Sequence, residues 1–187
     1  LDAVARALRD INRYPDREFT ALREGFASYL GHGLSRDQIW AANGSNEVLQ
    51  HVLQAFGGPG RRAFGFGPTY SMYPLLTRAT GAEYVAGTRA PDYTLSAESA
   101  AAQVQEAQPD IVFLCAPNNP TGTPMSMEVI AAVYEATRGM VVVDEAYHEF
   151  SSHGEGSALS LLPGRERLIV SRTMSKAFAF AGARVGY

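Results

Sequence analysis

Two uninterrupted apolar runs, Ile111–Cys115 and Met140–Val143, constrain the fold of this chain more than any other feature. A strand that is apolar at every position is buried on both faces, as in parallel sheets covered by helices on each side. Around these runs, segments with helical spacing of apolar residues alternate with short strand-like segments. We therefore predict a three-layer α/β/α fold with a mostly parallel sheet in the middle.

The remaining elements follow from the spacing of apolar residues and from the residues that end each segment. Gly31 and Gly57 follow two expected helices, and Ser96 is the expected N-cap of a third. The expected helices cover residues 1–11, 19–30, 48–56, 70–80, 97–107 and 127–137. The expected strands cover residues 39–42, 62–65, 83–86, 111–115, 140–143 and 168–170, and residues 183–187 are strand-like. A polar, Gly-rich loop is expected over residues 151–156.

Length, charge and cysteine content exclude several classes of function. The 187 residues suffice for one domain with a substantial core, so we treat 1–187 as a single domain. A net charge of −3 gives no basic surface for nucleic acid. No apolar run approaches the roughly 20 residues of a membrane helix, and the N-terminus lacks a signal-peptide pattern. Cys115, the single cysteine, is expected to be a buried apolar residue, and a reducing cytoplasmic location fits best.

Lys176 is the only lysine in the chain. It follows the expected strand 168–170, with the hydroxyls of Thr173 and Ser175 before it and the small or apolar residues 177–180 after it. A lysine shielded from water loses its proton readily and becomes a nucleophile toward carbonyl groups. A lone lysine is otherwise a solvated surface ammonium, but these neighbours favour a desolvated Lys176, and the rest of the chain must show whether there is a carbonyl cofactor for it to hold.

The polar residues that directly follow the strands identify the candidate site, because ligands of open α/β sheets bind beyond the carboxyl ends of the strands. Asp144 ends a buried strand, where burial raises the pKa of a carboxylate unless a cation lies beside it. Taken singly, such residues are often ordinary caps and turns. They occupy residues 44–46, 68–70, 118–122, 144–147 and the cluster around Lys176.

Two further features favour an anion at this edge. Gly44, Ser45 and Asn46 stand at the start of a helix, where free N–H groups and the helix dipole attract negative charge. Arg184 lies in the strand-like run 183–187, where an arginine is expected to pair with a buried anion.

Together these residues match the needs of a pyridine-aldehyde cofactor with a phosphate group. Such a cofactor needs a lysine for its aldehyde, a carboxylate for its ring nitrogen and a flat aromatic side chain on its ring face. It also needs hydrogen-bond donors for its ring oxygen, and a helix N-terminus with an arginine for its phosphate. The sequence offers a candidate for each requirement.

The same residues carry a resemblance that covers essentially the whole chain, with the motifs in the same order. The chain resembles fold-type I pyridoxal-phosphate aminotransferases in segments 118–122, 144–147, 175–176 and 182–184. Within that superfamily it is most similar to the histidinol-phosphate aminotransferases, in segments 13–16, 68–73, 144–150 and 172–178.

The resemblance implies a role for each residue that faces the cofactor ring. Lys176 is expected to form a Schiff base with pyridoxal 5'-phosphate and to move the proton during catalysis. Asp144 is expected to pair with the ring nitrogen and Tyr70 to stack on the ring face. Asn119 and Tyr147 are expected to hydrogen-bond the phenolic oxygen of the ring.

The resemblance also implies how the phosphate is held and how subunits assemble. Tyr14 is expected to reach the phosphate of the neighbouring subunit's cofactor, which implies a homodimer with shared sites. The residues expected to hold the phosphate within the chain are Gly44, Ser45, Asn46, Thr173, Ser175 and Arg184.

Two parts that the family normally has are not found in this sequence. One is the small C-terminal domain with the arginine that grips the substrate carboxylate, and the other is the N-terminal arm over the site. We therefore expect residues 1–187 to be the pyridoxal-phosphate-binding large domain of a longer protein.

The implied activity is transamination of histidinol phosphate with 2-oxoglutarate in histidine biosynthesis, a reaction of a small amino donor with a 2-oxo acid acceptor. An aromatic amino-acid aminotransferase is the nearest alternative. A phosphothreonine decarboxylase on the same fold is another, although such lyases tend to have Phe at the position of Tyr147. A non-catalytic relative that acts as a binding module is disfavoured because Lys176, Asp144 and Arg184 are all retained. The sequence predicts no metal site.

Overall fold

A computed structural model describes residues 2–151 and 156–187. Most of the loop expected over residues 151–156 therefore lies outside the described residues, as does Leu1 at the start of the first expected helix. The chain divides into two compact units, one up to Ala41 and one from Ala42 onwards. The assignment of residues 1–187 to one large domain stays a prediction.

The first unit is helical, as the sequence predicts. Gly31 ends its longest helix with a positive φ of 68°, a conformation in which glycine is favoured. The ring of Phe19 packs edge-to-face on Trp40, with 5.9 Å between their centroids. The elements are α1 (Asp2–Ala7), η1 (Leu8–Asp10), α2 (Thr20–Leu30) and η2 (Arg36–Gln38).

The second unit contains a five-stranded sheet in which every strand pairing is parallel, in the order β3-β2-β4-β5-β6. This confirms the predicted α/β fold with its mostly parallel sheet. The strands are β2 (Arg62–Gly67), β3 (Glu83–Thr88), β4 (Ile111–Cys115), β5 (Met140–Asp144) and β6 (Leu168–Ser171).

A second, two-stranded sheet pairs β1 (Ala42–Asn43) with β7 (Val185–Gly186) in antiparallel fashion. The strand expected over residues 39–42 is therefore wrong in extent, because Ile39 to Ala41 form no strand pairing in the described structure. Pairing needs a partner, and β7 extends only far enough to pair with Ala42 and Asn43.

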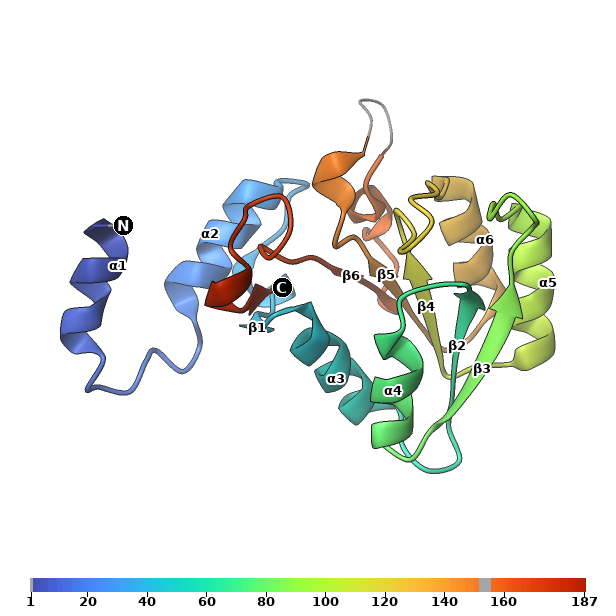
Figure 1. Cartoon of the computed structure of the whole chain (residues 1–187), viewed down its shortest axis with the longest axis horizontal. Helices are drawn as coiled ribbons and strands as arrows, with labels where there is room; N and C mark the ends of the chain where they lie inside the picture. The colour runs from blue at the N-terminus through green and yellow to red at the C-terminus, as the bar shows by residue number, and fades with distance from the viewer. Residues whose placement is uncertain (1, 152–155) are drawn as a thin grey trace. The chain divides into compact units, whose positions relative to one another are not determined.

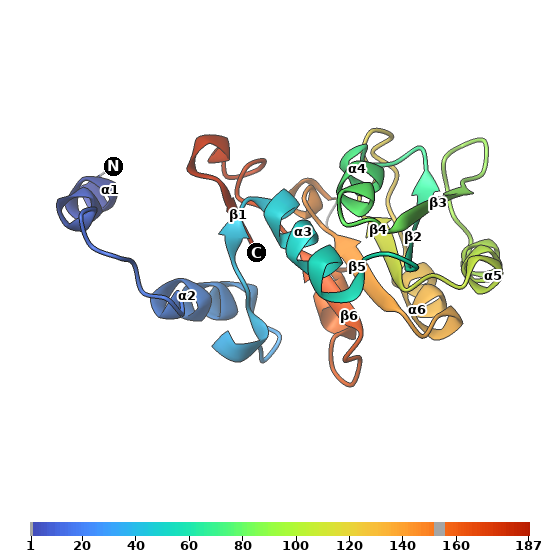
Figure 2. The same cartoon turned by 90° about the horizontal axis from the view of Figure 1, so that it is seen from below.

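Helices cover both faces of the five-stranded sheet (Figures 1 and 2). The helices α5 and α6 pack on one face, while α3 and α4 pack on the other. Ser96 caps α5 as predicted, accepting a hydrogen bond from the Ser99 amide. The sequence places the start of α4 at Tyr70, but the helix begins at Met72. The helices are α3 (Ser45–Phe56), α4 (Met72–Ala79), α5 (Ala97–Ala107) and α6 (Met127–Ala136), with short turns η3 (His148–Phe150), η4 (Ala158–Leu161) and η5 (Ala181–Ala183).

The alternation of side chains along β4 explains why this strand is apolar throughout. Val112 and Leu114 join the core under α5 and α6, whereas Ile111, Phe113 and Cys115 join the core under α3 and α4. All five are at most 3% exposed. Because the strands are parallel, their carboxyl ends lie at one edge of the sheet, and the polar residues that follow them meet there. In the part of the chain that the structure describes, no helix combines the length and apolar character needed to cross a membrane.

Candidate active site

One open pocket at the carboxyl edge of the sheet brings the predicted site residues together. Every predicted residue except Gly44 and Tyr14 lines it, and Gly44 lies beside Arg184 at its rim. Cys115 and Ala146 also line it. The predicted residues in the pocket wall are Ser45, Asn46, Tyr70, Asn119, Asp144, Tyr147, Thr173, Ser175, Lys176 and Arg184.

Asp144 forms the buried end of the pocket. It is the last residue of β5, and it is only 2% exposed. Its Oδ2 accepts a hydrogen bond from the Tyr73 hydroxyl at 2.9 Å, and its Oδ1 accepts from the Ala146 amide at 3.2 Å and from Ser171 Oγ at 3.3 Å. Burial raises the pKa of Asp144, while these three hydrogen bonds oppose that rise. Among the described residues, no arginine, lysine or histidine pairs with this carboxylate.

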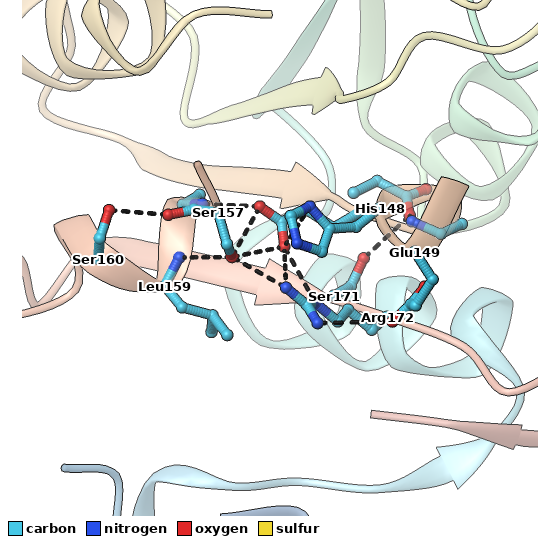
Figure 3. Close-up of polar contacts among 11 residues, drawn as sticks. His148, Glu149, Ser157, Leu159, Ser160, Ser171 and Arg172 are labelled. Atoms are coloured by element: carbon cyan, nitrogen blue, oxygen red, sulfur yellow. Dashed lines mark hydrogen bonds and ion pairs between the residues drawn. The ribbon is translucent and has the colours of Figure 1, made fainter. Parts of the chain in front are cut away.

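The adjacent carboxylate, Glu145, has the opposite arrangement. It is equally buried, but Arg172 Nη2 and Nε lie 2.8 Å and 3.0 Å from its Oε2. Ser157 Oγ and the Ala158 amide donate two further hydrogen bonds to it. Figure 3 shows the charged side chains around Arg172, including Glu149, whose Oε1 lies 3.5 Å from Nη1. The charge of Glu145 is therefore compensated inside the chain, whereas the charge of Asp144 is open to the pocket.

Aromatic and amide side chains form the walls of the pocket. The Tyr70 hydroxyl donates to Asn46 Oδ1 at 3.1 Å, which ties the segment before α4 to the start of α3. The backbone N–H of Asn119 donates a hydrogen bond to Cys115 Sγ at 3.3 Å. The ring of Tyr147 lies under Lys176, with 5.3 Å between Nζ and the ring centroid.

The predicted desolvation of Lys176 is wrong in this structure. Lys176 is exposed, and residues 177–180 are exposed with it. The chain turns directly after the lysine, as the hydrogen bond from the Ala179 amide to the Lys176 carbonyl shows, and Ala179 takes a positive φ of 51°. The apolar neighbours are themselves exposed, so they do not bury the lysine. Its contact with the Tyr147 ring is a cation–π interaction instead.

The N-terminus of α3 and Arg184 form the outer end of the pocket. Gly44 is the N-cap of α3, with a φ of 86°, and a Cβ at this position would collide with the Arg184 guanidinium. The pairing of β1 with β7 brings these two residues together. Thr173 Oγ1 donates to Ser175 Oγ at 3.0 Å, and Arg184 Nη1 lies 3.4 Å from the same Ser175 oxygen. Hydroxyl, guanidinium and helix terminus thus converge as expected of an anion site.

The conformation expected for Arg184 is wrong, although its place in the pocket is as predicted. The residue is exposed and has a left-handed φ of 56°, because it ends η5 and β7 begins only at Val185. Its backbone amide donates to the Ala181 carbonyl at 3.4 Å. The guanidinium contacts the Asn43, Ser175 and Ala181 oxygens rather than a buried anion.

Tyr14, like Gly44, does not line this pocket. It belongs to the first unit, and its side chain is fully exposed. Its role toward a neighbouring subunit stays a prediction.

Several residues around the pocket were missed in the sequence. Tyr73 contacts Asp144 from the far side, and Cys115 contributes its sulfur to the pocket wall. Asn118, within the predicted segment 118–122, forms hydrogen bonds with Thr69, with the Pro68 carbonyl and with Arg89, and the role of Arg89 was missed. The face alternation of β4 could have placed Cys115 near Tyr73. No sequence signal predicts the contact with Arg89, because it depends on how two loops meet.

The sequence relationships agree with this geometry. The model of the aminotransferase class I and II family matches residues 1–187, so the chain belongs to that family. Two curated relatives are histidinol-phosphate aminotransferases, from Paenarthrobacter aurescens (strain TC1) and Thermobifida fusca (strain YX). The first is 70% identical over 100% of this chain, which corresponds to 51% of the relative's length. The second is 56% identical over 99% of this chain, which corresponds to 50% of the relative's length. The chain thus spans about half the length of the curated relatives it matches.

A solved structure shows the same fold. The histidinol-phosphate aminotransferase from Sinorhizobium meliloti, solved in complex with pyridoxal-5'-phosphate, superposes with a TM-score of 0.88 at 27% identity. The similarity covers 98% of this chain and 50% of the solved chain.

Proposed function

We propose that this chain is the cofactor-binding part of a pyridoxal-phosphate-dependent aminotransferase whose amino donor is histidinol phosphate. One observation carries the proposal: Asp144, a buried carboxylate with no cationic partner among the described residues, shares an open pocket with the only lysine of the chain. A pocket with this pair at its ends suits a cationic ring that also has a carbonyl group. The histidinol-phosphate aminotransferases at 70% and 56% identity support the choice of substrate.

The residues present fit the cofactor on the chemistry of the chain alone. When bound, pyridoxal 5'-phosphate supplies an aldehyde that condenses with amines and a protonated pyridine ring that withdraws electrons from the carbon being transformed. Asp144, which burial makes costly to ionise, would gain the cation that the described residues do not give it. Lys176 would supply the amine, and its exposed Nζ is free to accept and donate the proton that must move.

The other predicted residues would orient the cofactor and hold its phosphate. Tyr70 is proposed to stack on the ring, with its hydroxyl kept in place by Asn46. Asn119 and Tyr147 are proposed to hydrogen-bond the ring oxygen.

At the outer end, no side chain among the described residues caps the N-terminus of α3, whose dipole favours an anion, and Arg184 adds a full positive charge. The proposed phosphate ligands are Gly44, Ser45, Asn46, Thr173, Ser175 and Arg184.

In the proposed reaction, the amino group of histidinol phosphate is transferred to 2-oxoglutarate, in histidine biosynthesis. An aromatic amino-acid aminotransferase has the same site requirements at the cofactor and is the first alternative. The decarboxylase alternative is disfavoured by the hydroxyl of Tyr147, which a lyase of this fold tends to lack.

The assembly and location are also proposals. Tyr14, exposed in the first unit, is proposed to reach the cofactor phosphate of a second copy in a homodimer. A cytoplasmic location is supported by the lone, buried Cys115, which forms no disulfide within the chain.

Steady-state kinetics of the full-length protein test the proposal. With 2-oxoglutarate as acceptor, kcat/KM is measured for histidinol phosphate, phenylalanine and tyrosine as donors. We expect the highest value for histidinol phosphate, since each methylene or polar group that a site recognises changes kcat/KM by about tenfold or more. A preference for the aromatic amino acids would reverse the assignment of substrate, and release of carbon dioxide from phosphothreonine, assayed alongside, would favour the lyase.

A further inference from the structure

Tyr73 is a fully buried polar contact of Asp144 for which the sequence predicts no role. Its side chain is 0% exposed, and its hydroxyl donates to Asp144 Oδ2 at 2.9 Å. Its ring is stacked on Phe113, with 4.8 Å between the centroids and 8° between the planes. The same ring packs edge-to-face against Tyr70, at 5.5 Å and 82°. One buried tyrosine therefore contacts both the carboxylate and the aromatic side chain proposed to hold the cofactor ring.

We propose that Tyr73 is a positioning residue of this site, whose hydroxyl orients the Asp144 carboxylate and whose ring supports Tyr70. The inference rests on the proposed function, because it assigns Asp144 and Tyr70 to the cofactor ring. Tyr73 itself lies behind both residues and does not line the pocket.

The contact between Tyr73 and Asp144 fixes which oxygen faces which partner. Oδ1 accepts hydrogen bonds from the Ala146 amide and from Ser171, the last residue of β6, whereas Oδ2 accepts one from the Tyr73 hydroxyl. Burial and the nearby Asp144 carboxylate raise the pKa of Tyr73 well above its usual value, so the phenol stays a donor. The Cys115 thiol also lies close to both groups, and its own pKa is raised to about 11, so it stays uncharged.

Without the hydroxyl, Asp144 would lose the largest of the three hydrogen bonds that favour its charged form. The carboxylate would then bind its proton more readily and could turn about its side-chain torsion. Both changes weaken the negative charge that the ring nitrogen of the proposed cofactor needs beside it.

The test compares Tyr73→Phe with Tyr84→Phe in the full-length protein. Both variants lose one tyrosine hydroxyl at the same core cluster, but only Tyr73 contacts Asp144. The Phe ring keeps the stack on Phe113, so the fold is retained. The first readout is the carboxyl ¹³C titration of Asp144 in cofactor-free protein, with the signal assigned by its absence in Asp144→Asn. The second readout is kcat and KM of transamination.

We expect Tyr73→Phe to shift the Asp144 titration to higher pH and to lower kcat by about tenfold to a hundredfold, because a hydrogen bond to a charged group is lost. Tyr84→Phe should leave the titration in place and kcat within about twofold. An unchanged Asp144 titration in Tyr73→Phe would overturn the proposal, even with reduced turnover, because the damage would then not pass through Asp144. If the wild-type protein has no aminotransferase activity, the proposed function fails, and the titration alone still decides whether Tyr73 controls Asp144.

Discussion

The two ends of the pocket are built in different ways. At the inner end, Asp144 and Tyr73 belong to regular elements, are almost fully buried and hold each other by a hydrogen bond. At the outer end, Lys176 and Arg184 lie in a turn and beside a short 3-10 helix, and both are exposed. The inner end is thus fixed by the packing of the sheet, whereas the outer end depends on local turns and on whatever binds there.

Because of this difference, we expect substitutions at the two ends of the pocket to affect different properties of the protein. A buried polar group is costly when it loses its partner, so changes at the inner end should be felt in the free energy of unfolding. An exposed lysine or arginine contributes little to folding, so changes at the outer end should be felt in binding and turnover.

The largest expected effect is on turnover at the outer end. Lys176→Ala should lower kcat of the full-length protein by at least about 10³-fold, because the proton carrier is removed. The free energy of unfolding of the cofactor-free protein should change by no more than about 0.5 kcal/mol, since the side chain is exposed. Stopped assays and urea unfolding measure the two quantities. A large loss of stability would show that Lys176 belongs with the buried end.

The largest expected effect on stability comes from the ion pair behind Asp144. Arg172→Met leaves Glu145 charged and buried, and should cost about 3–5 kcal/mol of unfolding free energy. Arg61→Met is the matched control, because Arg61 pairs with Asp110 at the surface and is 60% exposed. It should cost no more than about 1 kcal/mol. Urea unfolding measures both losses of unfolding free energy. Equal losses in the two variants would contradict the difference expected between a buried and an exposed ion pair.

Asp144→Asn should change how the free energy of unfolding depends on pH, because it removes the titrating carboxyl group at the inner end of the pocket. The pKa of Asp144 is raised in the folded protein, so the folded state binds its proton more tightly than the unfolded state. Cofactor-free wild type therefore loses stability as the pH rises from the usual carboxyl pKa through the raised one. The Asn variant lacks this titration, so its advantage in unfolding free energy should grow with pH.

Urea unfolding of both proteins across a pH series checks this expectation, and a difference that is independent of pH would contradict it. With cofactor bound, the same variant should keep the cofactor but lose at least about 100-fold in turnover, because the developing charge on the ring is no longer matched.

The smallest expected effect tests the start of α3. Gly44→Ala and Gly58→Ala each place a Cβ on a residue with positive φ, which costs about 1 kcal/mol in stability. Only the Cβ at Gly44 meets the Arg184 guanidinium, while the one at Gly58 meets open space. We expect weaker binding of pyridoxal 5'-phosphate in Gly44→Ala alone, measured by equilibrium titration. Equal affinities of the two variants for pyridoxal 5'-phosphate would show that its phosphate does not bind at the start of α3.

Much of the inner end could be predicted from the sequence, because it depends on strands. The apolar runs Ile111–Cys115 and Met140–Val143 correspond to β4 and β5, and a parallel sheet requires their polar successors to share an edge. The position of Asp144 at the end of a buried strand, and the burial of its side chain, were therefore predicted correctly. Tyr73 was missed because its contact depends on where α4 begins and how it packs on Phe113.

The outer end was predicted less well, since local conformation decides it. The residues around Lys176 and Arg184 were placed at the pocket, but their exposure was not foreseen. Apolar neighbours indicate desolvation only when the chain folds them over the lysine, and here they are themselves exposed. The left-handed φ of Arg184 likewise depends on η5, which has no signal in the sequence.

Covalent trapping of the cofactor tests the central claim most directly. The full-length protein, loaded with pyridoxal 5'-phosphate, is reduced with borohydride and digested with trypsin, which cleaves at Arg172 and Arg184. We predict a pyridoxyl group on Lys176 within the peptide of residues 173–184, and a protein that loses this adduct in Lys176→Ala. Cleavage at an unmodified Lys176, which gives peptides 173–176 and 177–184, in a protein that retains its bound cofactor would contradict the assignment of this pocket.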